Sequence, residues 1–354
     1  MLKLRRGVVT STDPLTVEVE GRERPAWADR SLVGEIEPGD EVIVNTEALD
    51  LGLGSGGFDL VHVNLTRGLG AEGGGGAHVM KLNYTSLQHA VEPVDRPLEG
   101  EGPAAPPPVL VLPLHGHLAP AAWAAAQARP GLRTGFVQTA GGALPGTMSR
   151  DVAELRARDL LAGHVTAGPA YGGEGEAISL AGALAAAAGL GWEAVVAAPG
   201  PGILGSATRY GHGGMAALDT AHAALALRSR TLLSPRLSGA DPRPRHRGLS
   251  HHTAAVLELL LAPVQVPVPE VEASGWPTPE ESPAGPEAGM LDELREACGE
   301  RHDIAVQPVD LAGYAASGLP TRTMGRELAD DPLFFAAALA AGRALAAAAS
   351  GGAR

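Results

Sequence analysis

The chain of 354 residues is poor in several residue types that mark particular protein classes. It has one cysteine, Cys298, so an intrachain disulfide is impossible and nothing requires an oxidising compartment. Only 3% of the residues are aromatic, and only two of the 27 cationic residues are lysines. The net charge of −13 excludes a basic protein that coats nucleic acid non-specifically.

Long apolar segments are also missing. The longest, residues 178–192, is mostly Ala, Gly and Leu and is shorter than the ~20 residues that span a bilayer. The first residues turn polar too early for a secretory signal peptide. A predicted C-terminal helix, 332–349, is apolar but contains Arg343. We therefore expect a cytoplasmic protein without a membrane partner.

Glycine and proline, in contrast, are abundant, at 48 and 29 residues. Glycine does not recur at every third position, which excludes collagen. The Ala, Leu and Val runs exclude a disordered chain. What remains is a loop-rich globular protein, long enough for two or three domains.

Residues 1–95 predict a small β-barrel-like domain. Short β-rich segments at 6–10, 15–20, 35–45 and 58–65 are separated by Gly and Pro turns. Such barrels often bind oligonucleotides, but this one is acidic and almost without aromatic residues, which argues against nucleic acid.

Residues 96–108 are rich in proline and predict a linker, after which 109–354 predict a three-layer Rossmann-like α/β domain. Short apolar strands alternate there with helical stretches, the pattern of a mostly parallel sheet covered on both faces. The predicted strands are 109–112, 134–138, 164–167, 194–198, 231–233 and 264–268. The predicted helices are 119–128, 150–161, 176–190, 214–227, 251–261, 292–301, 323–328 and 332–349. A Pro/Glu-rich excursion at 267–289 interrupts the pattern.

The loops after the predicted strands are the strongest indication of a site, because open parallel sheets bind ligands outside the carboxyl ends of their strands. Most of these loops are long and rich in glycine; they span 114–120, 139–149, 168–176, 199–214 and 234–253. Gly141, Gly142 and Glu174 are candidate ligand-binding residues in two of them.

Gly200, Gly202 and Gly205 form a G-x-G-x-x-G turn after a strand, where backbone N–H groups can contact an anion. Pro201 lacks an N–H, and Arg236 stands near the place where a dinucleotide site has an acid. A dinucleotide site, a tight structural turn and a site for another anion or polar ligand remain open.

Residues 207–252 are locally basic: seven arginines and two acids give a charge of +5. Arginine forks bind phosphate and carboxylate, so we take Arg209, Arg236 and Arg247 as candidate ligand-binding residues. The alternative is a solvated loop balanced by the acidic run at 270–303.

Histidines in and near this window are candidate acids, bases or ligands. Ser250 is predicted to cap a helix whose first turn holds two of them, where they are expected to be neutral. The candidate catalytic residues are His115, His246, His251, His252 and Asp241.

A metal site is a further possibility, since His115 and His117 alternate in one segment and Asp219 and His222 share a helix face. No spacing here is diagnostic of a metal, and hydrogen-bonding histidines are the alternative. Cys298 is expected to be packed rather than nucleophilic.

Four segments resemble a bacterial family, the domain of unknown function 3866 family. They are V-N-T-E-A-L-D-L-G-L-G-S-G-G-F (44–58), H-V-M-K-L-N-Y-T-S-L-Q (78–88), P-G-I-L-G-S-A-T (201–208) and D-P-R-P-R-H-R-G-L-S-H-H-T (241–253). The family pattern G-T-G-T reads Gly-Ser-Ala-Thr at 205–208 here. The resemblance covers residue 1 to about residue 268 and implies one shared architecture, without a mechanism.

The sequence thus predicts an α/β protein that binds or transforms a small anionic molecule, bearing phosphate or carboxylate, at the strand carboxyl ends. If it is an enzyme, a hydrolase or transferase is favoured over an oxidoreductase, with no cofactor specified. The alternative is a non-catalytic scaffold or regulator acting as a homo-oligomer, through the Ala-rich C-terminal helix.

Overall fold

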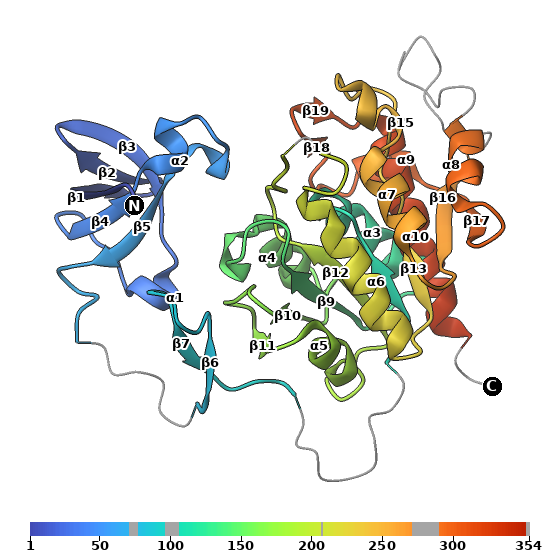
Figure 1. The fold of residues 1–354 in the computed structure, drawn as a ribbon, viewed down its shortest axis with the longest axis horizontal. Helices are drawn as coiled ribbons and strands as arrows, with labels where there is room; N and C mark the ends of the chain where they lie inside the picture. The colour runs from blue at the N-terminus through green and yellow to red at the C-terminus, as the bar shows by residue number, and fades with distance from the viewer. Residues whose placement is uncertain (71–76, 96–105, 207, 271–289, 352–354) are drawn as a thin grey trace. The chain divides into compact units, whose positions relative to one another are not determined.

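The computed structural model describes residues 1–70, 77–95, 106–206, 208–270 and 290–351. They divide into two compact units, Met1–Glu92 and Pro93–Arg354 (Figure 1). Most of the predicted linker, 96–105, lies outside the described residues, as does 271–289 of the predicted excursion.

The first unit contains a closed five-stranded barrel in the order β1-β2-β3-β5-β4. The strands are β1 (Leu4–Thr12), β2 (Leu15–Val19), β3 (Arg22–Trp27), β4 (Glu41–Asn45) and β5 (Asp59–Asn64). Alternate residues point inward, and a small aliphatic core of mainly valines fills the barrel. The unit also contains two short helices, α1 (Arg30–Val33) and α2 (Glu47–Asp50), and the hairpin of β6 (Val79–Lys81) and β7 (His89–Val91). The predicted barrel is confirmed.

The second unit is built on an eight-stranded sheet in the order β11-β10-β9-β12-β8-β13-β16-β17. Every pair of neighbouring strands in it is parallel. The strands are β8 (Val109–Val111), β9 (Thr134–Thr139), β10 (Gly163–Ala167), β11 (Gly175–Ala177), β12 (Ala194–Pro199), β13 (Thr231–Leu233), β16 (Gln265–Pro269) and β17 (Asp303–Gln307). The predicted Rossmann-like sheet is therefore confirmed.

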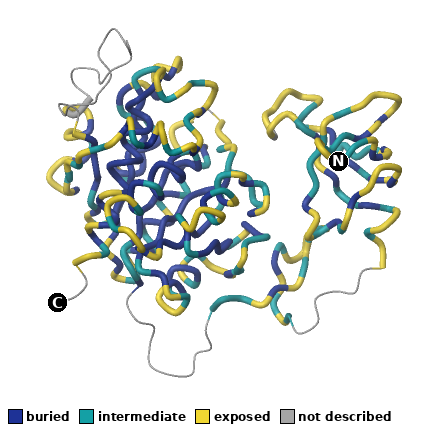
Figure 2. Tube along the Cα trace, turned by 180° about the vertical axis from the view of Figure 1, so that it is seen from behind, coloured by how far each residue is buried: buried dark blue, intermediate teal, exposed yellow. Residues whose placement is uncertain are grey.

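Helices cover both faces of this sheet, because its strands are apolar on both sides. One face packs against α3 (Leu118–Ala128), α4 (Arg150–Ala157), α9 (Leu311–Ala315) and α10 (Pro332–Ser350). The other packs against α5 (Leu180–Ala186), α6 (Ala216–Ala226), α7 (His251–Leu259) and α8 (Met290–Cys298). Figure 2 shows the buried residues of this unit gathered in its interior, with the exposed residues around them.

The chain reverses its direction of winding around β8. From β8 it runs by α3 and α4 to β9 and β10, with both helices on one face. It then returns to place β12 beside β8 and continues by α6, on the other face, to β13. The loops after β8 and β12 therefore leave neighbouring strands toward opposite faces, which is the topological switch point where open sheets bind ligands.

Helix α10 is long and apolar enough to cross a membrane, but 78% of its most apolar 18-residue window is buried inside the unit. It packs against α3 and the sheet, and Gly342 permits the approach: a Cβ there would lie 2.0 Å from the Ala121 carbonyl oxygen. α10 is thus a core helix, and it does not offer the exposed face that self-association through it would need.

Three local predictions were wrong. Residues 323–328 form the hairpin of β18 (Arg322–Thr323) and β19 (Arg326–Glu327) instead of a helix. The helix predicted from residue 176 begins only at Leu180, because the chain first adds β11 to the sheet and Ser179 caps the helix. The first residues of the predicted excursion, 267–269, are the end of β16.

We predict that Gly342→Val destabilises the protein by about 2–3 kcal/mol, because its side chain overlaps the Ala121 carbonyl and must push α10 away from α3. Urea unfolding of the full chain measures this change. Ala347→Val places the same residue on the exposed side of α10 and should cost under about 1 kcal/mol. Equal losses in the two variants would contradict the close-packing account.

Candidate functional site

A pocket of about 600 Å³ lies at the switch point, within the α/β unit. The loops after β8, β12 and β13 form its walls, together with the start of α4 and the β18–β19 hairpin. Its charged and imidazole side chains are His115, Asp151, His212, Arg236, Arg243, Arg245, His246, His251, His252 and Arg322. Histidines and arginines from three separate strand loops therefore meet in one cavity.

Four glycines hold the loops after β9 and β12 in direct backbone contact. A Cβ on Gly213 would lie 1.7 Å from the carbonyl oxygen of Gly141, and a Cβ on Gly142 would lie 2.1 Å from that of Gly200. Real Cβ atoms do not approach oxygen so closely, so larger residues would separate the loops. Gly141, Gly142 and Gly200 thus act in packing the loops, whereas Gly202 and Gly205 line the pocket.

Four histidines gather on one side of the pocket. The rings of His212 and His252 stack with their centroids 3.5 Å apart and their planes at 9°. The ring centroids of His246 and His251 lie 4.7 and 4.4 Å from that of His252. One nitrogen from each of His212, His251 and His252 lies within 4.8 Å of the other two.

The hydrogen bonds of this cluster begin at the N-terminus of α7, where Ser250 caps the helix as the sequence predicts. Its Oγ accepts the backbone N–H of His252 at 3.3 Å and is 2.7 Å from Nδ1 of His246. His212 Nε2 lies 3.1 Å from the carbonyl oxygen of Arg209, an acceptor, so Nε2 carries the hydrogen and Nδ1 is left with a lone pair. Nδ1 of His212 and Nε2 of His251 are buried without a partner among the described residues.

Burial keeps these imidazoles neutral at ordinary pH. It lowers the pKa of His246 to about 3, with Arg236 adding to the effect. It lowers the pKa of His252 to about 2, reinforced by His212 and His251, and lowers those of the latter two as well. Neutral rings can accept hydrogen bonds or bind a metal, in agreement with the expectation for the start of α7.

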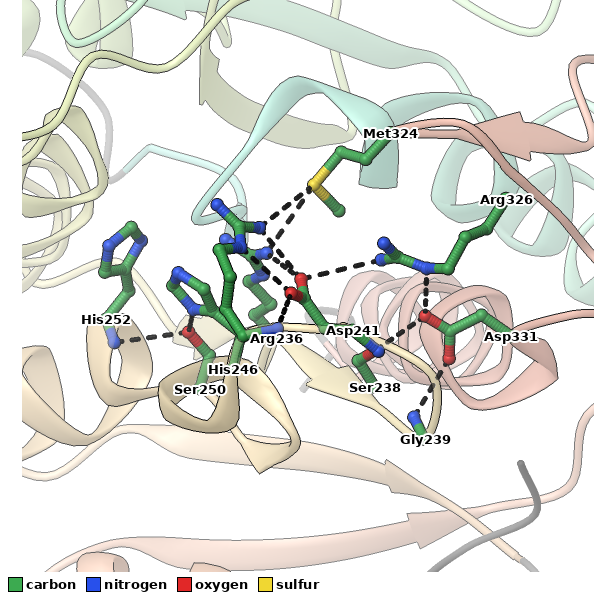
Figure 3. Close-up of polar contacts among 11 residues, drawn as sticks. Arg236, Ser238, Gly239, Asp241, His246, Ser250, His252, Met324, Arg326 and Asp331 are labelled. Atoms are coloured by element: carbon green, nitrogen blue, oxygen red, sulfur yellow. Dashed lines mark hydrogen bonds and ion pairs between the residues drawn. The ribbon is translucent and has the colours of Figure 1, made fainter. Parts of the chain in front are cut away.

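Arginines form a network of ion pairs with two buried aspartates beside the histidines (Figure 3). Asp241 lies 3.0 Å from Arg236, 2.8 Å from Arg243 and 3.6 Å from Arg326. Burial alone would raise the pKa of Asp241, but hydrogen bonds from Arg243 and the nearby cations hold it well below its usual range.

Asp331 closes the network from the start of α10. It accepts hydrogen bonds from the Ser238 hydroxyl at 2.6 Å, the Gly239 backbone N–H at 3.0 Å and Arg326 at 3.1 Å (Figure 3). The core helix and the loop after β13 are thereby joined. The three arginines and two aspartates of the network sum to a charge of +1.

His115 and His117 sit apart from this cluster, in the loop after β8. His115 Nδ1 lies 3.2 Å from the Pro199 carbonyl and Nε2 lies 2.7 Å from Ser149 Oγ, so both ring nitrogens are engaged. His117 bonds Ser234 through Nδ1 and packs edge-on against Phe334. Among the described residues, these two histidines do not form a metal-ligand group.

The remaining candidates lie outside the pocket. Glu174 forms an ion pair with Arg156, and Arg209 with Glu258. Arg247 is exposed and lines a neighbouring hollow near α8.

Asp241 does not line the pocket, but it forms ion pairs with two arginines that do. His222, on α6, accepts a hydrogen bond from the backbone N–H of Leu261 through its Nε2.

The pocket also contains His212, Arg243 and Arg322, which are not among the site residues predicted from the sequence. His212 follows the glycine turn and lies in the basic segment 207–252 with other histidines, so the sequence does contain a signal for it. Arg243 lies in the basic window, but its pairing with Asp241 depends on the fold. Arg322 enters from the C-terminal hairpin, for which the sequence offers no pocket signal.

A family profile described as protein of unknown function (DUF3866) matches residues 25–342. The chain belongs to this family. The match runs from the barrel into α10, so both units are part of the family's architecture. Comparisons with curated proteins and with solved structures gave no match. The family's description states no activity.

The buried histidines predict acid sensitivity. Burial and the charge of Arg236 lower the pKa of His117 from 6.5 to about 3. The unfolded chain binds this proton near pH 6.5 and the folded chain resists it, so stability is full above 6.5 and is lost as the pH falls toward 3. By pH 5 the loss from this group is about 2 kcal/mol.

Urea unfolding between pH 8 and pH 5 tests this, with His117→Asn expected to flatten the decline by about 2 kcal/mol. His62→Asn, on the half-exposed β5 position, is the control and should keep the wild-type slope. An unchanged slope in His117→Asn would contradict the prediction.

Proposed function

We propose that the pocket binds a small molecule carrying a phosphate or a carboxylate. The observation that carries this proposal is the charge of its wall: Arg236, Arg243, Arg245 and Arg322 line it, against the single carboxylate of Asp151. A volume of about 600 Å³ is in the range of small-molecule sites. Guanidinium forks bind such anions with charge-assisted hydrogen bonds.

The deepest cation of this wall is held in place without being fully neutralised. Arg236 is 4% exposed, and burial lowers its pKa to about 10, so it stays charged at neutral pH. One of its terminal nitrogens reaches Asp241, while its Nε is buried without a partner among the described residues. Because Asp241 is shared with two further arginines, the network retains positive charge for a ligand.

Hydrolysis or group transfer is the chemistry that suits this arrangement. Arginines stabilise negative charge on a reacting phosphate or carboxylate, and neutral imidazoles exchange protons with it. His246 and His115 line the same pocket and are our candidates for that role. A homo-oligomeric scaffold remains the alternative prediction, but the burial of α10 removes the surface first assigned to it.

Titration of the full chain with inorganic phosphate and with succinate, by calorimetry, tests the proposal. We expect at least one to bind, and Arg322→Gln to weaken its affinity about fivefold, the effect of roughly 1 kcal/mol from one exposed charge.

Arg247→Gln is the matched control, since it also removes an exposed arginine, but one outside the pocket. It should leave the affinity unchanged. If neither anion binds, or both variants weaken binding equally, the pocket is not the anion site.

A further inference from the structure

The cluster of His212, His251 and His252 holds two buried ring nitrogens to which no other described residue hydrogen-bonds. His212 and His252 are 8% and 9% exposed. Nδ1 of His212 and Nε2 of His251 have no partner among the described residues. A buried polar atom without a partner costs about 1–3 kcal/mol, so such atoms in one place indicate a missing ligand.

The tautomer of His212 is set for metal binding. Its Nε2–H donates to the Arg209 carbonyl oxygen, 3.1 Å away, which leaves the lone pair on the buried Nδ1. Metal-binding histidines usually have such a backbone or carboxylate acceptor on their other nitrogen, which orients the ring and raises its basicity.

Gly214 leaves room beside ring nitrogens of His212 and His252. A Cβ at this position would lie 3.0 Å from Nδ1 of His212 and 3.2 Å from Nδ1 of His252. The backbone of Gly214 does not have a left-handed conformation, so local geometry does not demand glycine. A side chain at this position would instead occupy the space next to the two nitrogens.

We propose that His212, His251 and His252 bind one divalent transition-metal ion and leave one of its coordination positions open to the pocket. Zn²⁺ is the ion we choose to test this. Three imidazoles and an exchangeable position are a common zinc donor set. The nitrogens of a tetrahedral centre lie roughly 3.3 Å apart, so these three, within 4.8 Å of one another, must move closer. The stacked rings of His212 and His252 tilt toward each other to share the ion.

The surrounding charge couples the ion to the proposed anion. Arg236 and Arg243 line the same pocket and disfavour a bare cation. An anion at the open position offsets that repulsion, so phosphate should tighten metal binding. This coupling, unlike the metal site itself, rests on the proposed function.

Equilibrium dialysis of chelator-stripped full-length protein against Zn²⁺, with and without inorganic phosphate, tests the site. We expect one ion per chain and a tetrahedral Co²⁺ absorption band when Co²⁺ replaces Zn²⁺. His212→Gln and His252→Gln should each weaken binding about 100-fold or more. His62→Gln, a histidine of the barrel unit, should bind as the wild type does.

Gly214→Ala removes no histidine and serves where a ligand variant fails to fold. It should retain the wild-type melting temperature without metal and weaken Zn²⁺ binding at least tenfold. The metal site would be overturned if the wild type did not bind Zn²⁺, or if the three site variants bound it as tightly as the wild type does. Zn²⁺ binding that phosphate leaves unchanged would instead uphold the metal site and count against the proposed function.

Discussion

The site depends on the backbone contact between the loops that follow β9 and β12. The Gly213–Gly141 and Gly142–Gly200 pairs approach more closely than any Cβ would permit. This contact fixes the loop that carries His212, and α7 then brings His251 and His252 beside it. These four glycines therefore serve loop packing at the switch point.

A second constraint acts from the opposite side of the pocket. Asp241 and Asp331 partly neutralise three arginines, Arg236 and Arg243 of the loop after β13 and Arg326 of the β18–β19 hairpin. Asp331 also ties the loop after β13 to α10 through the Gly239 backbone N–H. Packing of α10 in the core and placement of the charged wall are thus linked. Loss of the Asp241 carboxylate would loosen the charged wall, because the buried guanidinium of Arg236 would lose its ion-pair partner.

Much of the fold is predictable from the chain, for identifiable reasons. Continuous apolar strands separated by Ala-rich helices can satisfy both faces only in a parallel, covered sheet, and six strands were placed within one or two residues. The hairpin at 322–327 could not be recognised, since its turn needs positive φ at Met324 and Gly325, and methionine gives no such signal. The shift of the 176–190 helix to Leu180 reflects strand pairing by β11, which is a tertiary effect.

The site was partly predictable for the same kind of reason. His251 and His252 could be located because Ser250 is a strong N-cap, and Arg236 because it follows a strand. Which of the many histidines meet depends on strand order, which no local pattern encodes: β12 returns to lie beside β8 and brings His212 with its loop. His115 and His117 alternate in one segment, yet they bind different partners, Ser149 and Ser234.

Hydrogen exchange measured by mass spectrometry on wild-type and Gly213→Ala protein tests the dependence on the glycine contact most directly. Alanine fits the backbone at this position but not the 1.7 Å approach to Gly141. The account predicts faster exchange in residues 139–149 and 208–215 and at the start of α7, with α10 unchanged. Wild-type exchange in both loops, or a loss of protection throughout the α/β unit, would contradict it.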